Sequence, residues 1–178
     1  MRTLRSMETG RWFNVSYLDA SAAVKLVVQE PGSENLHEYF HPPDGPRGGF
    51  RITTLCFAEA LGVLKRKWQR SQLSDDQYRG KCYMLVTHCS RPGGRIILED
   101  TGLEDRQKFM ESTKIAKRHN LDLSDALQLL TVKYGKFRRN VEESKTLLIT
   151  ADRDLAAAAE AEGLRVWNCE TEPTPPSQ

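Results

Sequence analysis

Apolar residues along this chain fall into two patterns: short runs that are typical of buried strands, and longer stretches that have helical spacing. The short runs predict five strands, at residues 13–18, 50–54, 95–99, 146–150 and 164–167. The longer stretches predict helices at residues 20–28, 33–40, 55–70, 103–120, 125–137 and 152–162, with one more that begins at Ser74. Strands that alternate with helices indicate an α/β fold, in which a parallel sheet of about five strands is covered by helices on both faces.

Local signals indicate where several of these elements end. Ser74 followed by Gln77 fits a capping box at a helix N-terminus. Ser124 is the expected N-cap of the helix at 125–137. Gly163 is the expected C-cap of the helix at 152–162. Prolines and glycines between residues 42 and 49 predict a loop.

The chain contains no internal repeat and no linker long enough to separate two domains. Three prolines gather in the last eight residues, which favours disorder there. We therefore expect an N-terminal extension at residues 1–12, one domain at residues 13–168, and a disordered C-terminal tail at residues 169–178.

Composition limits the class of protein. The 178 residues are 39% hydrophobic and 28% charged, as in an ordinary soluble domain. No apolar run approaches the roughly 20 residues that cross a bilayer, and the first 13 residues lack the apolar core of a secretory signal. A net charge of +2 neither favours nor excludes a nucleic-acid partner. Four scattered cysteines without a C-x-x-C pair predict reduced thiols in a cytoplasmic protein.

Four acidic residues stand at the start or in the middle of otherwise apolar segments: Asp19, Glu59, Asp125 and Asp152. Asp19 and Asp152 directly follow predicted strands, Glu59 lies one turn into a helix, and Asp125 lies at a helix N-terminus. Ligands of parallel sheets bind beyond the carboxyl ends of the strands, so one edge of the sheet can gather all four acids. Carboxylates are seldom buried unless they are paired or bind a metal, and Mg²⁺ prefers oxygen ligands. The set therefore indicates one shared cation site.

Each acid has a simpler explanation when it is taken alone. Asp19 and Asp152 could each cap the helix that follows a strand. Asp125 could only favour the helix dipole in a first turn, and Glu59 could face solvent on an amphipathic helix. The argument for a site depends on finding all four in one chain.

The segments around these acids resemble those of a known family. Residues 17–26, YLDASAAVKL, resemble the opening block of PIN-domain ribonucleases, especially the VapC-like toxins of toxin–antitoxin systems. Residues 53–60 (TTLCFAEA), 121–129 (LDLSDALQL) and 148–155 (LITADRDL) resemble the later blocks of that family. The resemblance spans about residues 15 to 168. The chain departs from the family pattern in the 18 residues that precede Asp19 and in a longer loop at 42–49.

This resemblance implies a three-layer α/β/α sandwich and a metal-dependent endoribonuclease that leaves a 5′-phosphate and a 3′-hydroxyl. It implies that the catalytic and metal-binding residues are Asp19, Glu59, Asp125 and Asp152. Asp154 would be an accessory acid, and Ser21 and Thr150 would orient ligands or waters. The cofactor would be Mg²⁺ or Mn²⁺, with Asp19 and Asp152 as the expected direct ligands, because Mg²⁺ keeps several waters and few carboxylates. The implied partners are an RNA substrate, an antitoxin protein and a second copy in a homodimer.

An RNA substrate would need basic side chains along its path. Candidates lie in three groups: Lys65, Arg66, Lys67 and Arg70; Lys114, Lys117 and Arg118; and Lys133, Lys136, Arg138 and Arg139. Each group could equally be a solvated helix face.

Three other functions compete with the nuclease. Residues 37–41, HEYFH, fit the zinc-protease pattern, with Glu59 as the nearest third ligand, but Pro42 follows at once and takes His41 out of helical geometry. A phosphate- or nucleotide-handling enzyme lacks support, because no glycine-rich turn follows the first strand and Asp19-Ala20-Ser21 lacks a second aspartate. A non-catalytic PIN-fold module that binds RNA or protein stays as the alternative, although it would have no need for four mutually repelling acids.

Overall fold

A computed structural model describes residues 15–42, 49–89, 94–102, 104–135 and 146–176. In these residues five parallel strands form one sheet in the order β3–β2–β1–β4–β5. The strands are β1 (Val15–Leu18), β2 (Gly49–Thr53), β3 (Ile96–Glu99), β4 (Thr146–Thr150) and β5 (Arg165–Asn168). The predicted parallel sheet is confirmed, and the strand order reverses direction at β1, where β2 and β4 lie on its two sides.

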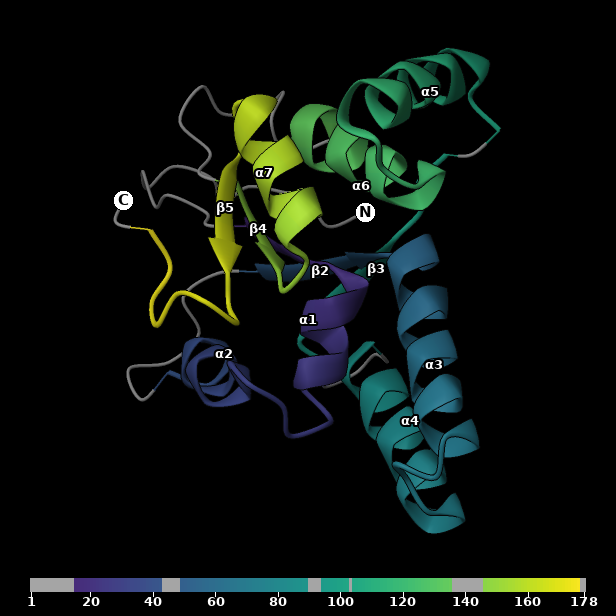
Figure 1. The fold of residues 1–178 in the computed structure, drawn as a ribbon, viewed down its shortest axis with the longest axis vertical. Helices are drawn as coiled ribbons and strands as arrows, with labels where there is room; N and C mark the ends of the chain where they lie inside the picture. The colour runs from purple at the N-terminus through teal and green to yellow at the C-terminus, as the bar shows by residue number, and fades with distance from the viewer. Residues whose placement is uncertain (1–14, 43–48, 90–93, 103, 136–145, 177–178) are drawn as a thin grey trace, which may run out of the picture.

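Helices cover both faces of the sheet, so the molecule has the expected three layers (Figure 1). One core contains side chains from four helices: α1 (Ala20–Lys25), α2 (Ser33–Phe40), α3 (Thr54–Gln69) and α4 (Asp75–Cys89). The core on the other face contains side chains from α5 (Arg106–His119), α6 (Leu123–Tyr134) and α7 (Arg153–Ala161). Alternation along β1 produces this division, because Leu18 packs in the first core and Tyr17 in the second.

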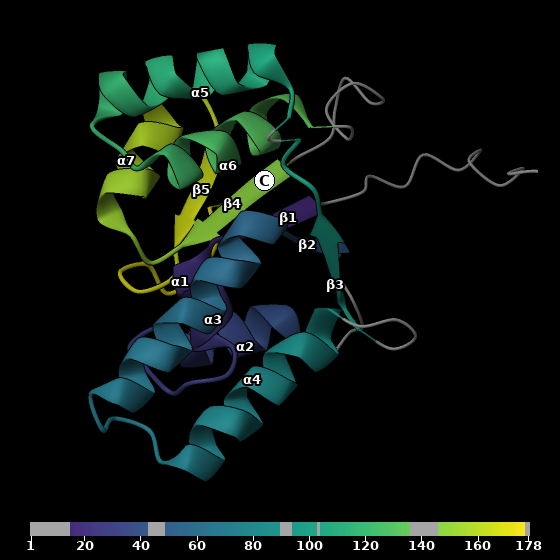
Figure 2. The same ribbon diagram turned by 90° about the vertical axis from the view of Figure 1, so that its right-hand side faces the viewer.

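Helices α3 and α4 form a hairpin that extends away from the sheet (Figures 1 and 2). Thr53 caps α3 by accepting a hydrogen bond from the backbone N–H of Cys56. The capping box of α4 is confirmed: Ser74 N donates to Gln77 Oε1 at 2.8 Å, and Gln77 N donates to Ser74 Oγ at 3.2 Å. Stacking of Trp68 on Tyr78 joins the two helices near the turn.

Two helices begin two or more residues away from the predicted start. Helix α5 begins at Arg106 rather than 103, because the Asp105 side chain accepts from the backbone N–H groups of Gln107 and Lys108. Helix α6 begins at Leu123, and Asp122, not Ser124, is its N-cap. Asp122 has an extended backbone, and its carbonyl accepts the first helical bond from Ala126 N. The expected last residues of α6, 136 and 137, lie outside the described residues.

The segment after β5 packs against the domain. Cys169 is wholly buried, and the Trp167 indole donates to the Glu172 carbonyl at 3.0 Å. Gly32 faces this segment at φ +83°, where an added Cβ would lie 2.1 Å from the Cys169 carbonyl oxygen. Residues 169–172 thus differ from the expected disordered tail, because they fill space beside α2. The expected extension at 1–12 lies outside the described residues.

Two simple findings complete the description. No helix in the described part of the chain is long and apolar enough to cross a membrane. The four cysteines are free thiols, as expected.

Candidate active site

Asp19 lies at the centre of the site, directly after β1, and its side chain is almost completely buried. Its Oδ2 accepts three hydrogen bonds: from Ser21 Oγ at 2.7 Å, from Thr150 Oγ1 at 3.0 Å and from Ser21 N at 3.2 Å. Burial raises the pKa of Asp19, and these bonds act in the opposite direction by stabilising the carboxylate.

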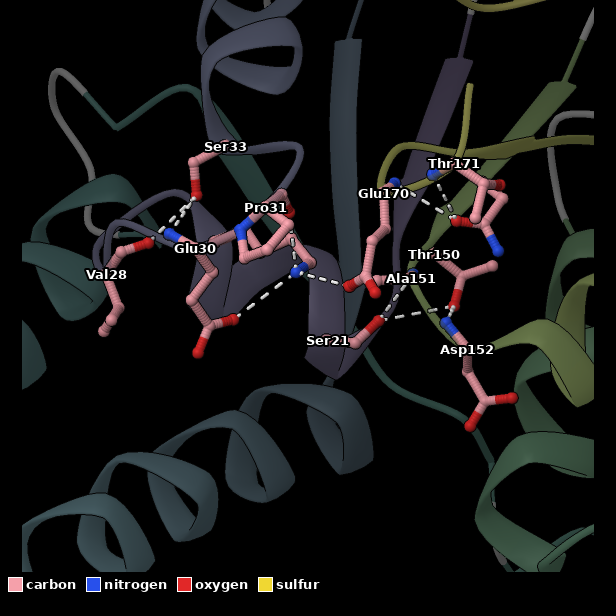
Figure 3. A network of polar contacts seen from close by, with 12 residues as sticks. Ser21, Val28, Glu30, Pro31, Ser33, Thr150, Ala151, Asp152, Glu170 and Thr171 are labelled. Carbon is pink, nitrogen blue, oxygen red and sulfur yellow. Dashed lines mark hydrogen bonds and ion pairs between the residues drawn. The ribbon is translucent and has the colours of Figure 1, made fainter. Parts of the chain in front are cut away.

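Ser21 and Thr150 fix the carboxylate of Asp19 across two strands. Ser21 Oγ accepts from Ala151 N at 2.8 Å, and Thr150 Oγ1 accepts from Asp152 N at 2.9 Å (Figure 3). Each hydroxyl has one proton, and both protons point to Asp19. The backbone after β4 is therefore tied through two hydroxyls to the acid after β1, and both residues orient Asp19.

Asp152 is the N-cap of α7 and is exposed. Its Oδ1 accepts from Asp154 N at 2.8 Å and Leu155 N at 3.0 Å, and its carboxylate points away from Thr150 (Figure 3). The simpler explanation of this residue as a helix cap is thus correct, as it is for Asp19. Capping places both carboxylates at the carboxyl edge of the sheet, so it does not compete with a role in a site.

Glu59 on α3 is exposed, and Asp125 on α6 is partly exposed. The pKa of Asp125 is raised to about 7, first by burial and then by the charges of Asp19, Glu59 and Asp152. The pKa of Glu59 is also raised, by burial, by Asp19 and, less strongly, by Asp152. The four acids that the sequence singled out therefore lie close enough to repel one another.

A fifth acid, Asp122, belongs to the same group, and the sequence analysis missed it. Its charge raises the pKa values of both Glu59 and Asp125. The available signal was its position three residues before Asp125, at the N-cap of the same helix. Asp154, the expected accessory acid, is not among the charges that act on Glu59 or Asp125. It lines a separate hollow of about 280 Å³ with His119 and Asn120.

The donor set fits a hard divalent cation, since it consists of carboxylate and hydroxyl oxygens. Burial first and then the neighbouring carboxylates raise the pKa of Asp125, and a cation nearby would favour its charged form. Among the described residues, no three histidine, cysteine, aspartate or glutamate side chains already form a set that could hold a metal ion. Mg²⁺ generally keeps several waters and takes few carboxylates directly, so such a cation could reach part of this set through water.

Several of the candidate basic residues pair with acids outside the site. Arg66 lowers the pKa of Glu59 and so lies near the acids. Arg118 and Lys133 instead bind Glu162, at 2.7 and 2.6 Å. Lys67 pairs with Glu30, and three further candidates lie outside the described residues: Lys136, Arg138 and Arg139.

The histidine pair of the zinc-protease pattern lies in a different place. His41 is the C-cap of α2 and has left helical geometry, as the following proline predicted. Its ring lies 6.5 Å from that of His37, and its Nδ1 lies 2.9 Å from Arg95 Nη1. The guanidinium contact occupies one ring nitrogen of His41 with a cation, which does not suit a zinc ligand.

Comparison with known proteins defines the fold. No family model matches the chain, and no curated protein matches it significantly. A crystal structure of PAE2754 from Pyrobaculum aerophilum is similar over 88% of each chain, with a TM-score of 0.54 and 14% identity. This likeness shows a shared fold.

Proposed function

We propose that the protein is a metal-dependent endoribonuclease of the PIN-domain type that hydrolyses RNA phosphodiester bonds with Mg²⁺ or Mn²⁺. The observation that carries the proposal is the gathering of Asp19, Glu59, Asp125 and Asp152 from four elements at one edge of the sheet. Repelling carboxylates oppose folding, so a chain that brings four together has a use for the charge they attract.

In this mechanism Asp19 and Asp152 would hold the cation directly, and Glu59 and Asp125 would act through waters. A bound Mg²⁺ or Mn²⁺ lowers the pKa of a water and stabilises charge on the phosphate. Ser21 and Thr150 keep Asp19 in one orientation through Oδ2. Asp125, which is partly exposed and would reach the cation through water, is the residue that we assign to accept a proton from the attacking water.

The resemblance of the four sequence blocks adds a biological setting to the proposal. By that resemblance the protein is a cytoplasmic toxin of a toxin–antitoxin pair, is silenced by an antitoxin protein, and forms a homodimer. Arg66, which lies near Glu59, is the basic residue placed to meet a phosphate of the RNA.

The test is cleavage of a mixed RNA pool by the purified full chain in Mg²⁺, Mn²⁺ or EDTA, read on a denaturing gel. We expect wild type to cleave only with metal, and Asp19→Asn to lose activity by a factor of at least 100. The matched control is Asp76→Asn on α4, an exposed acid that pairs with Arg79 and should leave cleavage unchanged. Folded, metal-loaded wild type that cleaves nothing would favour the non-catalytic binding module.

A further inference from the structure

A buried amide and a buried thiol form a hydrogen bond in the core near the acids. Gln128 on α6 is wholly buried between Leu127 and Leu129. Its Oε1 accepts from the Cys56 thiol at 2.9 Å, and its Nε2 donates to the Leu18 carbonyl at 3.4 Å. Both partners agree with this orientation of the amide, because a flipped amide would set oxygen against the Leu18 oxygen.

The amide joins the three elements that carry three of the acids. Leu18 is the last residue of β1 and precedes Asp19. Cys56 lies three residues before Glu59 on α3, and Gln128 lies three residues after Asp125 on α6, spacings that place each pair on the same side of its helix. The hydrogen bonds of the Gln128 side chain therefore connect the elements that carry Asp19, Glu59 and Asp125.

Electrostatics places the thiol directly under the acids. Burial raises the pKa of Cys56 most, and the charges of Asp19, Glu59 and Asp125 raise it further. The thiol therefore stays protonated, and its S–H group donates a hydrogen bond to Gln128 Oε1. A leucine at position 128 would fill the same space without linking the elements, and a charged residue would be buried against the acids at a high cost.

We propose that Gln128, with Cys56 as its hydrogen-bond partner, is a positioning residue that sets the spacing of Asp19, Glu59 and Asp125 for a divalent cation. The inference rests on the proposed function, since it concerns the same site. Gln128 resists the mutual repulsion of the acids by holding α3 and α6 against the end of β1. Loss of an outer partner of metal ligands typically lowers metal affinity or activity 10- to 100-fold.

The first variant is Gln128→Met, which keeps the length of the side chain and removes both hydrogen bonds. Mn²⁺ affinity of the full chain is measured by titration calorimetry, alongside kcat and KM on an oligoribonucleotide that wild type cleaves. We expect Mn²⁺ binding at least tenfold weaker and kcat at least tenfold lower, with KM for RNA changed less than threefold. Leu85→Met is the matched control, because Leu85 is wholly buried on α4. This variant should bind Mn²⁺ within twofold of wild type.

A second pair of variants separates positioning from packing. Cys56→Ser keeps a donor for Gln128 and should bind Mn²⁺ within threefold of wild type. Cys56→Ala removes the donor and should approach Gln128→Met. Melting of each variant in EDTA establishes that the chain is folded before the cation is added.

Several outcomes would overturn the inference. A folded Gln128→Met variant with wild-type Mn²⁺ affinity refutes the positioning role. If that variant gives no cooperative melt, equal Mn²⁺ affinities of Cys56→Ser and Cys56→Ala refute the role instead. A wild type that binds Mn²⁺ but cleaves no RNA ends the proposed function, while a tenfold loss in Gln128→Met would still support the positioning role. A wild type that binds no Mn²⁺ overturns both.

Discussion

At the scale of single residues, the site depends on hydroxyls that hold one carboxylate. Thr150 donates to Asp19 Oδ2 and accepts from Asp152 N, so it contacts both acids proposed as direct ligands. Thr150 is also wholly buried. Loss of its hydroxyl would leave polar groups of Asp19 and Asp152 without this partner, which costs free energy in a buried position.

Replacing Thr150 with valine keeps the shape of the side chain and removes both bonds. We expect Thr150→Val to lower the free energy of unfolding by about 1–3 kcal/mol and to weaken Mn²⁺ binding about tenfold. Urea denaturation and Mn²⁺ titration measure the two effects. Thr87→Val is the control, because the exposed Thr87 hydroxyl donates to the Tyr83 carbonyl of its own helix, α4. Equal Mn²⁺ affinity in both variants would contradict a role for Thr150 in the site.

At the scale of elements, one buried acid joins three helices. Glu162, at the end of α7, binds Arg118 and His119 of α5 and Lys133 of α6, and its side chain is 7% exposed. Bonds to Lys133, His119 and Arg118 lower its pKa from 4.5 to about 2. Because the folded state holds the proton more weakly than the unfolded state, this acid stabilises the fold above pH 4.5 and loses its contribution as pH falls toward 2.

We expect Glu162→Gln to lower the free energy of unfolding at pH 7 by roughly 1–3 kcal/mol, a range that allows for solvent screening of the exposed Arg118. The difference from wild type should shrink steadily between pH 5 and pH 2. Urea denaturation across that range provides the measurement, and Glu160→Gln, an exposed neighbour on the same helix, is the control. A difference that stays constant with pH would show that the cost comes from packing rather than charge.

The comparison of prediction with structure also follows these elements. Alternation and turn residues predicted the strands within about two residues, since such signals are local: β4 agrees at both ends, and the cap of α4 agrees atom for atom. The start of α5 was missed because its N-cap, Asp105, lies among several acids, each of which could equally cap a helix as judged from the sequence. The Glu162 cluster could not be predicted, because its partners lie 29 to 44 residues away and meet only through helix packing.

The candidate site shows the same division between local and distant information. Asp19 and Asp152 were found because each follows a strand, a position that the sequence marks. Gln128 carried a weak signal as an amide between two leucines, but its partners Cys56 and Leu18 come from other elements and needed the fold. Burial was also judged poorly from local context, since Glu59 and Asp152 lie in apolar segments yet are exposed.

At the scale of the whole molecule, the acids set a conflict between stability and the proposed activity. The pKa of Asp125 is about 7 in the folded state against 3.8 in the unfolded state, so the folded state binds the proton more tightly. Stability without metal should therefore decrease as pH rises from about 4 to 7 through this group, and stay lower above 7. Relief of the same repulsion by a divalent cation should restore it.

Asp125→Asn removes one of the repelling charges and keeps the shape of the side chain. In EDTA at pH 8 we expect this variant to be more stable than wild type by roughly 1–3 kcal/mol, a range reduced for the partial exposure of Asp125, and to be inactive on RNA. At pH 5 the difference should be less than half of its value at pH 8, and it should disappear only below about pH 4, where the unfolded chain also binds the proton. Mg²⁺ should raise the melting temperature of wild type more than that of the variant. Thermal melts at both pH values, with and without Mg²⁺, measure these differences. A variant less stable than wild type at pH 8 in EDTA would contradict the prediction. It would mean that Asp125 stabilises the fold and that its charge is already compensated without a cation.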